Sequence, residues 1–129
     1  MGSEMCIRDR SNVTNILFAT ANCRSVENKL PSLYDFFDNT DCAAALLTET
    51  WIKTSTNLEN IYDDITKTRG LDIIYYNRPG KRKGGGVAIV FDKAKVNLEE
   101  HKFRRDGIEI VAAKGRISGQ KRKLFLFCI

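Results

Sequence analysis

The stretch that decides the fold is Ala43-Ala44-Ala45-Leu46-Leu47-Thr48-Glu49-Thr50-Trp51. Five apolar residues in a row predict a short strand buried on both faces, as in a parallel sheet that is covered by other elements. The run ends abruptly at polar residues, and Glu49 is the carboxylate among them. Open α/β sheets bind ligands beyond the carboxyl ends of their strands. Glu49 is therefore either a ligand-binding carboxylate or a side chain that becomes solvated where the strand leaves the core.

A strand–helix–strand unit is predicted around this stretch. Residues 15–22 form a mostly apolar segment that ends in Asn22, and the buried strand follows over 42–49. The apolar residues between these two segments are spaced as on one face of a helix: Val26, Leu30, Leu33, Tyr34 and Phe37. Pro31 suits a first helical turn, so we expect a turn over 26–30 and a helix over 31–38. A parallel pair joined in this way would place Asn22 and Glu49 at the same edge of one sheet.

The second half of the chain has the pattern of successive strands with short connections. Strands are predicted over 71–77, 87–92, 108–117 and 123–129, after a short helix over 58–65. Together with the first unit, this predicts an α+β fold with mixed sheets. Residues 1–12 lack apolar periodicity and a signal-peptide core, so we expect a disordered tag or artefactual segment there, and a domain over 13–129.

Composition indicates a single globular domain. The 129 residues are 43% hydrophobic and 29% charged, and no apolar run approaches the roughly 20 residues of a membrane span, so we expect a soluble protein without a membrane partner. The net charge of +5 is unevenly distributed: residues 27–64 carry −6, residues 67–83 carry +5 and residues 102–123 carry +6. This asymmetry suits a protein that holds a cation at one place and a polyanion at another.

Two reactive residue types are excluded from the expected chemistry. The four cysteines have no metal-ligand spacing and indicate reduced thiols of an intracellular protein. His101 stands alone in a charged stretch, so it is interpreted as a surface residue and gives no support for a nucleophilic triad or dyad.

A glycine triplet and two basic sets are the remaining candidate features. A phosphate-binding glycine loop leads into a helix, whereas Gly84–Gly86 leads into a predicted strand, which favours a bulge or a close backbone approach. The basic sets suit phosphate contacts without sequence specificity, although lysines that protect a sheet edge are an equal alternative for the second set. They are Arg78, Lys81, Arg82 and Lys83, and Lys121, Arg122 and Lys123.

Four segments in this order resemble the endonuclease/exonuclease/phosphatase superfamily: Asn22-Cys23-Arg24-Ser25, Asn28-Lys29-Leu30, Thr48-Glu49-Thr50-Trp51 and Lys83-Gly84-Gly85-Gly86-Val87-Ala88-Ile89. Within it, the chain is most similar to the apurinic-type endonuclease domain of non-LTR (LINE-type) retrotransposons, from about residue 15 to residue 129. The resemblance implies a four-layer α/β sandwich in which two sheets pack face to face. It also implies Mg²⁺- or Mn²⁺-dependent hydrolysis of DNA phosphodiester bonds for retrotransposon insertion.

The resemblance further implies roles for individual residues. Glu49 takes the role of metal ligand and catalytic residue, and Asn22 that of the catalytic Asn that hydrogen-bonds near the metal and the phosphate. The implied nucleic-acid-binding residues are Arg24, Arg78, Lys81, Arg82 and Lys83. No small-molecule cofactor is implied.

Two later motifs of the superfamily do not occur in this sequence. They are Gly-Asp-x-Asn, which supplies the water-activating Asp, and Ser-Asp-His, which supplies the final acid/base pair. We therefore expect the N-terminal half of such a domain, truncated at the C-terminus and inactive by itself. Its parent protein would hold the missing half and a reverse transcriptase, and would be intracellular and nuclear. The alternatives are a non-catalytic nucleic-acid-binding remnant and a phosphatase branch of the same superfamily.

Overall fold

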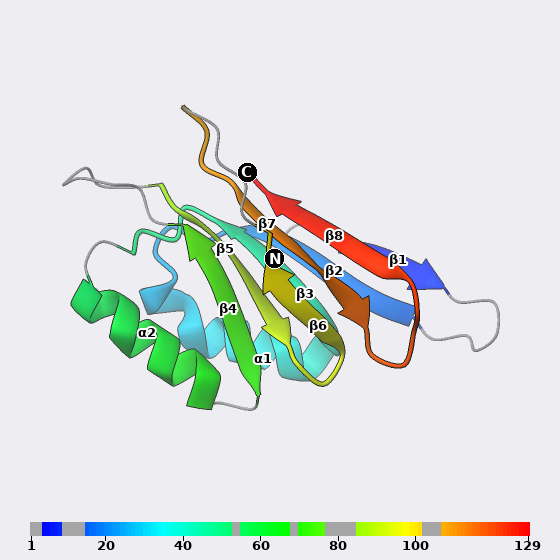
Figure 1. Ribbon diagram of the computed structural model, residues 1–129. Coiled ribbons are helices and arrows are strands. Elements are labelled where there is room, and N and C mark those ends of the chain that lie inside the picture. The colour runs from blue at the N-terminus through cyan, green and yellow to red at the C-terminus, as the bar shows by residue number, and fades with distance from the viewer. Residues whose placement is uncertain (1–3, 9–14, 53–54, 68–69, 77–84, 102–106) are drawn as a thin grey trace.

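The computed structural model describes residues 4–8, 15–52, 55–67, 70–76, 85–101 and 107–129. Figure 1 shows two helices on one side of a five-stranded sheet and a second, three-stranded sheet on its other side. The elements, in chain order, are β1 (Glu4–Arg8), β2 (Asn15–Asn22), a 3₁₀ helix (Glu27–Lys29), α1 (Leu30–Thr40), β3 (Cys42–Thr48), α2 (Ser55–Lys67), β4 (Leu71–Tyr76), β5 (Val87–Asp92), β6 (Val96–Glu100), β7 (Val111–Ile117) and β8 (Lys123–Cys128).

The large sheet is mixed and the small sheet is antiparallel. The strand order is β1-β2-β3-β5-β4 in the first and β6-β7-β8 in the second. Only β2 and β3 pair in parallel among the described strands, and α1 connects them. The prediction of an α+β fold built on a strand–helix–strand unit and mixed sheets is confirmed.

Helix α1 buries the apolar face that its sequence predicts. Leu30, Leu33 and Phe37 point into the core, and Pro31 lies in the first turn, where its missing N–H costs no intrahelical bond. The helix ends at Thr40, and its C-cap residue Asp41 takes the left-handed conformation with φ 60°. The helix was expected over 31–38, so the observed helix is slightly longer at both ends. The turn expected over 26–30 contains the 3₁₀ helix.

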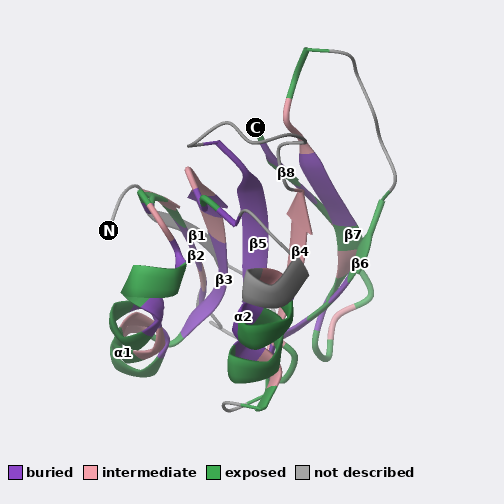
Figure 2. Cartoon of the chain, turned by 90° about the vertical axis from the view of Figure 1, so that its left-hand side faces the viewer, coloured by how far each residue is buried: buried purple, intermediate pink, exposed green. Residues whose placement is uncertain are grey.

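Strand β3 is apolar from Cys42 to Leu47, and two cores meet on it. Ala45 and Leu47 pack in the core under the helices, whereas Ala43 and Ala44 pack in the core between the two sheets. Ala43 and Ala44 are adjacent but pack in the same core, and the pairing of β3 with β2 shifts its register at this point. Figure 2 shows β5, which pairs with β3, as buried almost along its whole length. The prediction of a strand buried on both faces is confirmed.

Two segments differ from the sequence-based expectations. Glu4–Arg8, expected within an unstructured segment, pair antiparallel with β2 and fill an edge that would otherwise present unpaired backbone groups. Residues 1–3 and 9–12 lie outside the described residues. Strand β6 was not predicted, because Val96 and Leu98 are its only buried side chains, too few for a clear alternating pattern. The strands predicted over 15–22 and 87–92 match β2 and β5, and the other predicted elements are present with shifted ends. No described helix is long and apolar enough to cross a membrane.

Candidate functional site

The candidate site lies where the parallel strands β2 and β3 end together. Asn22, the last residue of β2, pairs with Thr48, the last residue of β3, and Glu49 follows at once. The chain thus brings Asn22 and Glu49 to the same edge of the large sheet. The prediction of their shared position is confirmed, whereas their chemical roles stay predictions.

The two segments that leave these strands remain hydrogen-bonded to each other. The amides of Cys23, Ser25 and Val26 donate to the carbonyl oxygens of residues 48, 49 and 50, each over 2.9 Å. These bonds hold the two segments side by side beyond the strand ends. Both segments therefore have fixed backbones at the sheet edge.

The backbone at this edge is strained. Arg24, Ser25, Glu49 and Trp51 are non-glycine residues with φ between 45° and 86°. Left-handed conformations of this kind cost about 1–2 kcal/mol per residue and persist where surrounding contacts enforce them, often at functional sites. The inter-segment hydrogen bonds supply that enforcement here.

The Glu49 carboxylate is held in one orientation. Its Oε2 atom accepts a hydrogen bond from Trp51 Nε1 over 2.7 Å and another from the Gly85 amide over 3.1 Å. The side chain is half-buried rather than extended into solvent. Because two donors orient this carboxylate, Glu49 is not merely a side chain that becomes solvated at the end of a strand.

Gly85 and Gly86 permit a close approach of the backbone to the segment after β3. Trp51 N donates to Gly85 O over 3.0 Å and Thr50 N to Gly86 O over 3.3 Å. Both glycines have positive φ, and a Cβ atom on Gly86 would lie 2.3 Å from Thr50 Oγ1. The interpretation of these glycines as a close backbone approach is confirmed; Gly84 lies outside the described residues.

Glu109 belongs to this site and was missed by the sequence analysis. Its Oε2 atom accepts the Gly86 amide over 2.6 Å. Glu109 precedes β7 of the small sheet, so the bond joins the two sheets beside Glu49. Gly86 and Glu109 are separated by 23 positions, and no local pattern in the sequence predicts their contact.

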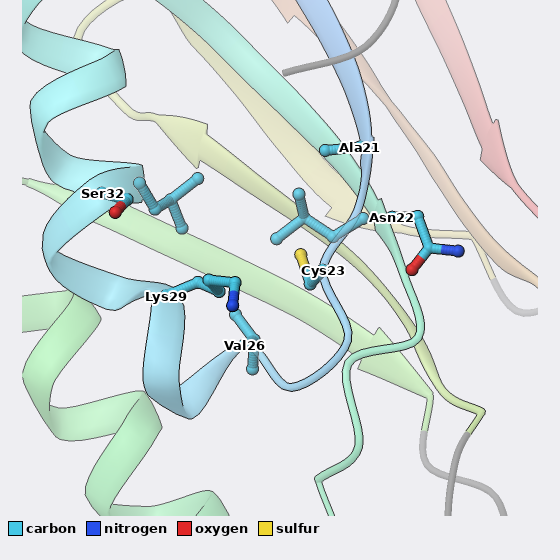
Figure 3. Close-up of a pocket in the computed structure, with 8 residues that line it drawn as sticks. Ala21, Asn22, Cys23, Val26, Lys29 and Ser32 are labelled. Atoms are coloured by element: carbon cyan, nitrogen blue, oxygen red, sulfur yellow. The ribbon is translucent and has the colours of Figure 1, made fainter.

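The side chains of Asn22 and Cys23 point in opposite directions. Figure 3 shows Asn22 pointing away from a pocket of about 150 Å³ toward which Cys23 points. The pocket lies between the end of β2 and the start of α1, and Asn22 is exposed. Burial raises the pKa of the Cys23 thiol to about 11, against the opposing charge of Lys29. A protonated thiol is a poor nucleophile and metal ligand at neutral pH.

The predicted basic residues divide into three groups. Arg24 is exposed in the segment after β2, whereas Arg78, Lys81, Arg82 and Lys83 lie outside the described residues. Lys123 begins β8, whose other end is near the site because Cys128 Sγ donates to Leu47 O over 3.3 Å. Five residues of extended strand place Lys123 about 17 Å from that end. This position favours the alternative that Lys121, Arg122 and Lys123 protect the sheet rather than serve the site.

Two predictions about unreactive residues agree with the structure. Cys23, Cys42 and Cys128 are buried thiols. His101 is exposed, with its ring 6.3 Å from that of Phe125 at 90°.

The donors at the site fit a hard divalent cation. Mg²⁺ prefers oxygen ligands, keeps several waters and takes one or two carboxylates, and the Glu49 carboxylate and Asn22 amide are oxygen donors at one edge. Within the described part of the chain, no three His, Cys, Asp or Glu residues gather into a metal cluster. The role of Glu49 as a metal ligand therefore stays a prediction.

Comparisons with known proteins identify the fold. No protein-family model and no curated protein matches the chain. The 3′ phosphatase NExo from Neisseria, bound to a product DNA hairpin, is similar with a TM-score of 0.50, and the 3′–5′ exonuclease NExo from Neisseria meningitidis with a TM-score of 0.51. Each is 16% identical, and each comparison covers 83% of this chain and 38% of the other.

These likenesses confirm the predicted fold class. The chain has an α+β sandwich whose fold resembles that of the two solved proteins, and it spans well under half of their length. The described residues form three layers of that sandwich: the helices, the large sheet and the small sheet.

Proposed function

We propose that the chain is the N-terminal part of a divalent-metal-dependent nuclease that hydrolyses DNA phosphodiester bonds. The observation that carries this proposal is the Glu49 carboxylate, oriented by Trp51 Nε1 and the Gly85 amide at the edge where β2 and β3 end. The similar solved proteins, a 3′ phosphatase bound to a DNA hairpin and a 3′–5′ exonuclease, support DNA as the substrate class.

Each residue of the edge has a proposed role. Glu49 binds Mg²⁺ or Mn²⁺, and the Asn22 amide hydrogen-bonds to a phosphate oxygen or orients a neighbouring carboxylate. When bound, the cation supplies positive charge that stabilises the phosphoryl oxygens in the transition state. Arg24 and the loop that contains Arg78, Lys81, Arg82 and Lys83 contact the phosphate backbone.

The retrotransposon branch is the finer part of this proposal. The Asn22–Ser25 and Thr48–Trp51 segments support it, and with it a nuclear parent protein that contains a reverse transcriptase. The coding sequence downstream of residue 129 tests this part. It should continue into Gly-Asp-x-Asn and Ser-Asp-His and then into reverse-transcriptase motifs; an immediate stop codon in the genomic sequence would contradict it.

Plasmid nicking by a protein extended through both later motifs tests the activity. Glu49→Gln should abolish Mg²⁺-dependent nicking while DNA binding persists, because an amide replaces the anionic ligand without removing the phosphate contacts. Glu59→Gln, which neutralises an exposed acid on α2, is the matched control and should nick normally. Unchanged nicking by Glu49→Gln would show that the metal-ligand assignment is wrong.

A phosphatase is the second candidate, because one similar solved protein is a 3′ phosphatase. The same extended protein can be offered a DNA hairpin with a 3′ phosphate. Release of inorganic phosphate without plasmid nicking would favour the phosphatase. DNA binding without either reaction would favour a non-catalytic binding protein.

A further inference from the structure

We infer that Glu109 is a positioning residue for the Glu49 carboxylate and acts through the backbone of Gly85 and Gly86. The inference deepens the proposed function, because Glu49 is the metal ligand there. The geometry that supports it nevertheless concerns the folded chain alone. It can therefore be tested without a metal.

The Gly85–Gly86 segment connects the two carboxylates. The Gly85 amide donates to Glu49 Oε2 over 3.1 Å, and the next amide, that of Gly86, donates to Glu109 Oε2 over 2.6 Å. A shift of the Gly86 peptide would therefore move the Gly85 amide and with it a donor of Glu49.

Glycine makes this segment dependent on outside contacts. Gly85 and Gly86 have φ of 77° and 89°, and without side chains they have more accessible backbone conformations than other residues. The bonds from Thr50 and Trp51 come from the same segment as Glu49 and would move together with it. Glu109 instead belongs to the connection that enters β7, so its bond fixes the glycines relative to the small sheet.

This role requires a side chain long enough to place an acceptor oxygen at the Gly86 amide. Glu109→Gln keeps the length and an acceptor oxygen but loses the charge. Glu109→Asp keeps the charge but is one methylene shorter, so it cannot hold the Gly86 amide in the same position. The two variants therefore separate positioning from a purely electrostatic effect.

Trp51 provides the readout, because it is the only tryptophan in the sequence and donates to both Glu49 and Gly85. Fluorescence emission and acrylamide quenching of Trp51 are measured without metal, with thermal unfolding to confirm folding. Glu109→Asp should move the emission to longer wavelength and increase quenching, and Glu109→Gln should match the unmodified protein. Glu100→Ala, an exposed acid of β6, is the control and should also match it.

Two outcomes would overturn the inference: equal spectra for all variants, or a Glu109→Gln spectrum that changes as much as that of Glu109→Asp. A Mn²⁺ titration of the same proteins separates this question from the proposed function. Where Mn²⁺ binds, Glu109→Asp should weaken it about tenfold, as for other residues that orient metal ligands. If Mn²⁺ binds neither the unmodified protein nor a protein extended through both later motifs, the metal site is wrong, and the Trp51 spectra still decide the role of Glu109.

Discussion

The indole N–H of Trp51 donates a 2.7 Å hydrogen bond to Oε2 of Glu49, two residues earlier in the chain. Both residues have positive φ, so the backbone between them turns sharply enough to bring the indole beside the carboxylate. The strained segment after β3 therefore creates the orientation of Glu49 rather than merely ending a strand.

Removal of this donor should lower stability. Trp51→Phe keeps an aromatic ring but loses the N–H, and a hydrogen bond to a charged acceptor at a partly exposed position is worth about 1 kcal/mol. Urea unfolding followed by circular dichroism gives the change. Tyr62→Phe removes a polar group from another exposed aromatic and should have a smaller effect; equal effects would argue against the Trp51–Glu49 bond.

Gly86→Ala should be among the most destabilising single substitutions at this edge. Its Cβ would lie 2.3 Å from Thr50 Oγ1 at φ 89°, and overpacking together with the strained φ should cost about 3 kcal/mol. Gly119→Ala has φ 80° but no atom within 4 Å of its Cβ, so it should cost about 1 kcal/mol. Similar unfolding free energies for both variants would contradict the close approach at Gly86.

Thr50→Val should stabilise the protein. Thr50 is 1% exposed, and its Oγ1 atom has no hydrogen-bond partner among the described residues. Replacement of this hydroxyl by a methyl group of similar shape removes a desolvation penalty of about 1 kcal/mol. Thr40→Val is the contrasting control, because Thr40 Oγ1 donates to Phe36 O over 2.6 Å. A loss of stability in Thr50→Val would point to a polar partner for its hydroxyl.

Two cysteine thiols should resist alkylation. Burial raises the pKa of Cys23 and Cys128 from 9.0 to about 11. The thiolate fraction at pH 8 is then about a hundredfold lower than for an ordinary thiol. Iodoacetamide labelling followed by peptide mass spectrometry should be slow at both positions in the folded protein and fast in urea. Rapid labelling of the folded protein would contradict their burial.

The same two thiols give stability a pH dependence. Because the folded state holds these protons more tightly than the unfolded state, their contribution is complete below pH 9 and decreases as the pH rises toward 11. Cys23→Ala and Cys128→Ala should each flatten the fall in urea midpoint over that range. A fall as steep as in the unmodified protein would assign the alkaline loss of stability to other groups.

The sequence predicts the parts of this site that depend on local patterns. The apolar run before Glu49 identifies β3, and the polar ends of two strands joined by α1 place Asn22 beside the same edge. Pairing of neighbouring strands needs no long-range information, because short connections and the strand–helix–strand unit restrict it. The close approach at Gly86 is also predictable, since a glycine at the start of a buried strand has few other uses.

The remaining parts depend on contacts between segments that no local pattern relates. Glu109 reaches Gly86 because the small sheet packs on the large one, and its sequence neighbours mark it only as an acid in a basic stretch. Trp51 binds Glu49 through a left-handed turn at two non-glycine residues, which sequence preferences disfavour. The pairing of β1 with β2 likewise depends on an available sheet edge and not on the composition of residues 4–8.

The most direct test of the central claim is a Mn²⁺ titration followed by the fluorescence of Trp51. A paramagnetic ion bound by Glu49 lies next to the indole that donates to this carboxylate, so Mn²⁺ should quench the emission in a saturable manner. Glu49→Gln should abolish the saturable quenching, and Glu59→Gln should leave it unchanged. Equal quenching of Glu49→Gln and the unmodified protein would contradict the assignment of Glu49 as the metal ligand.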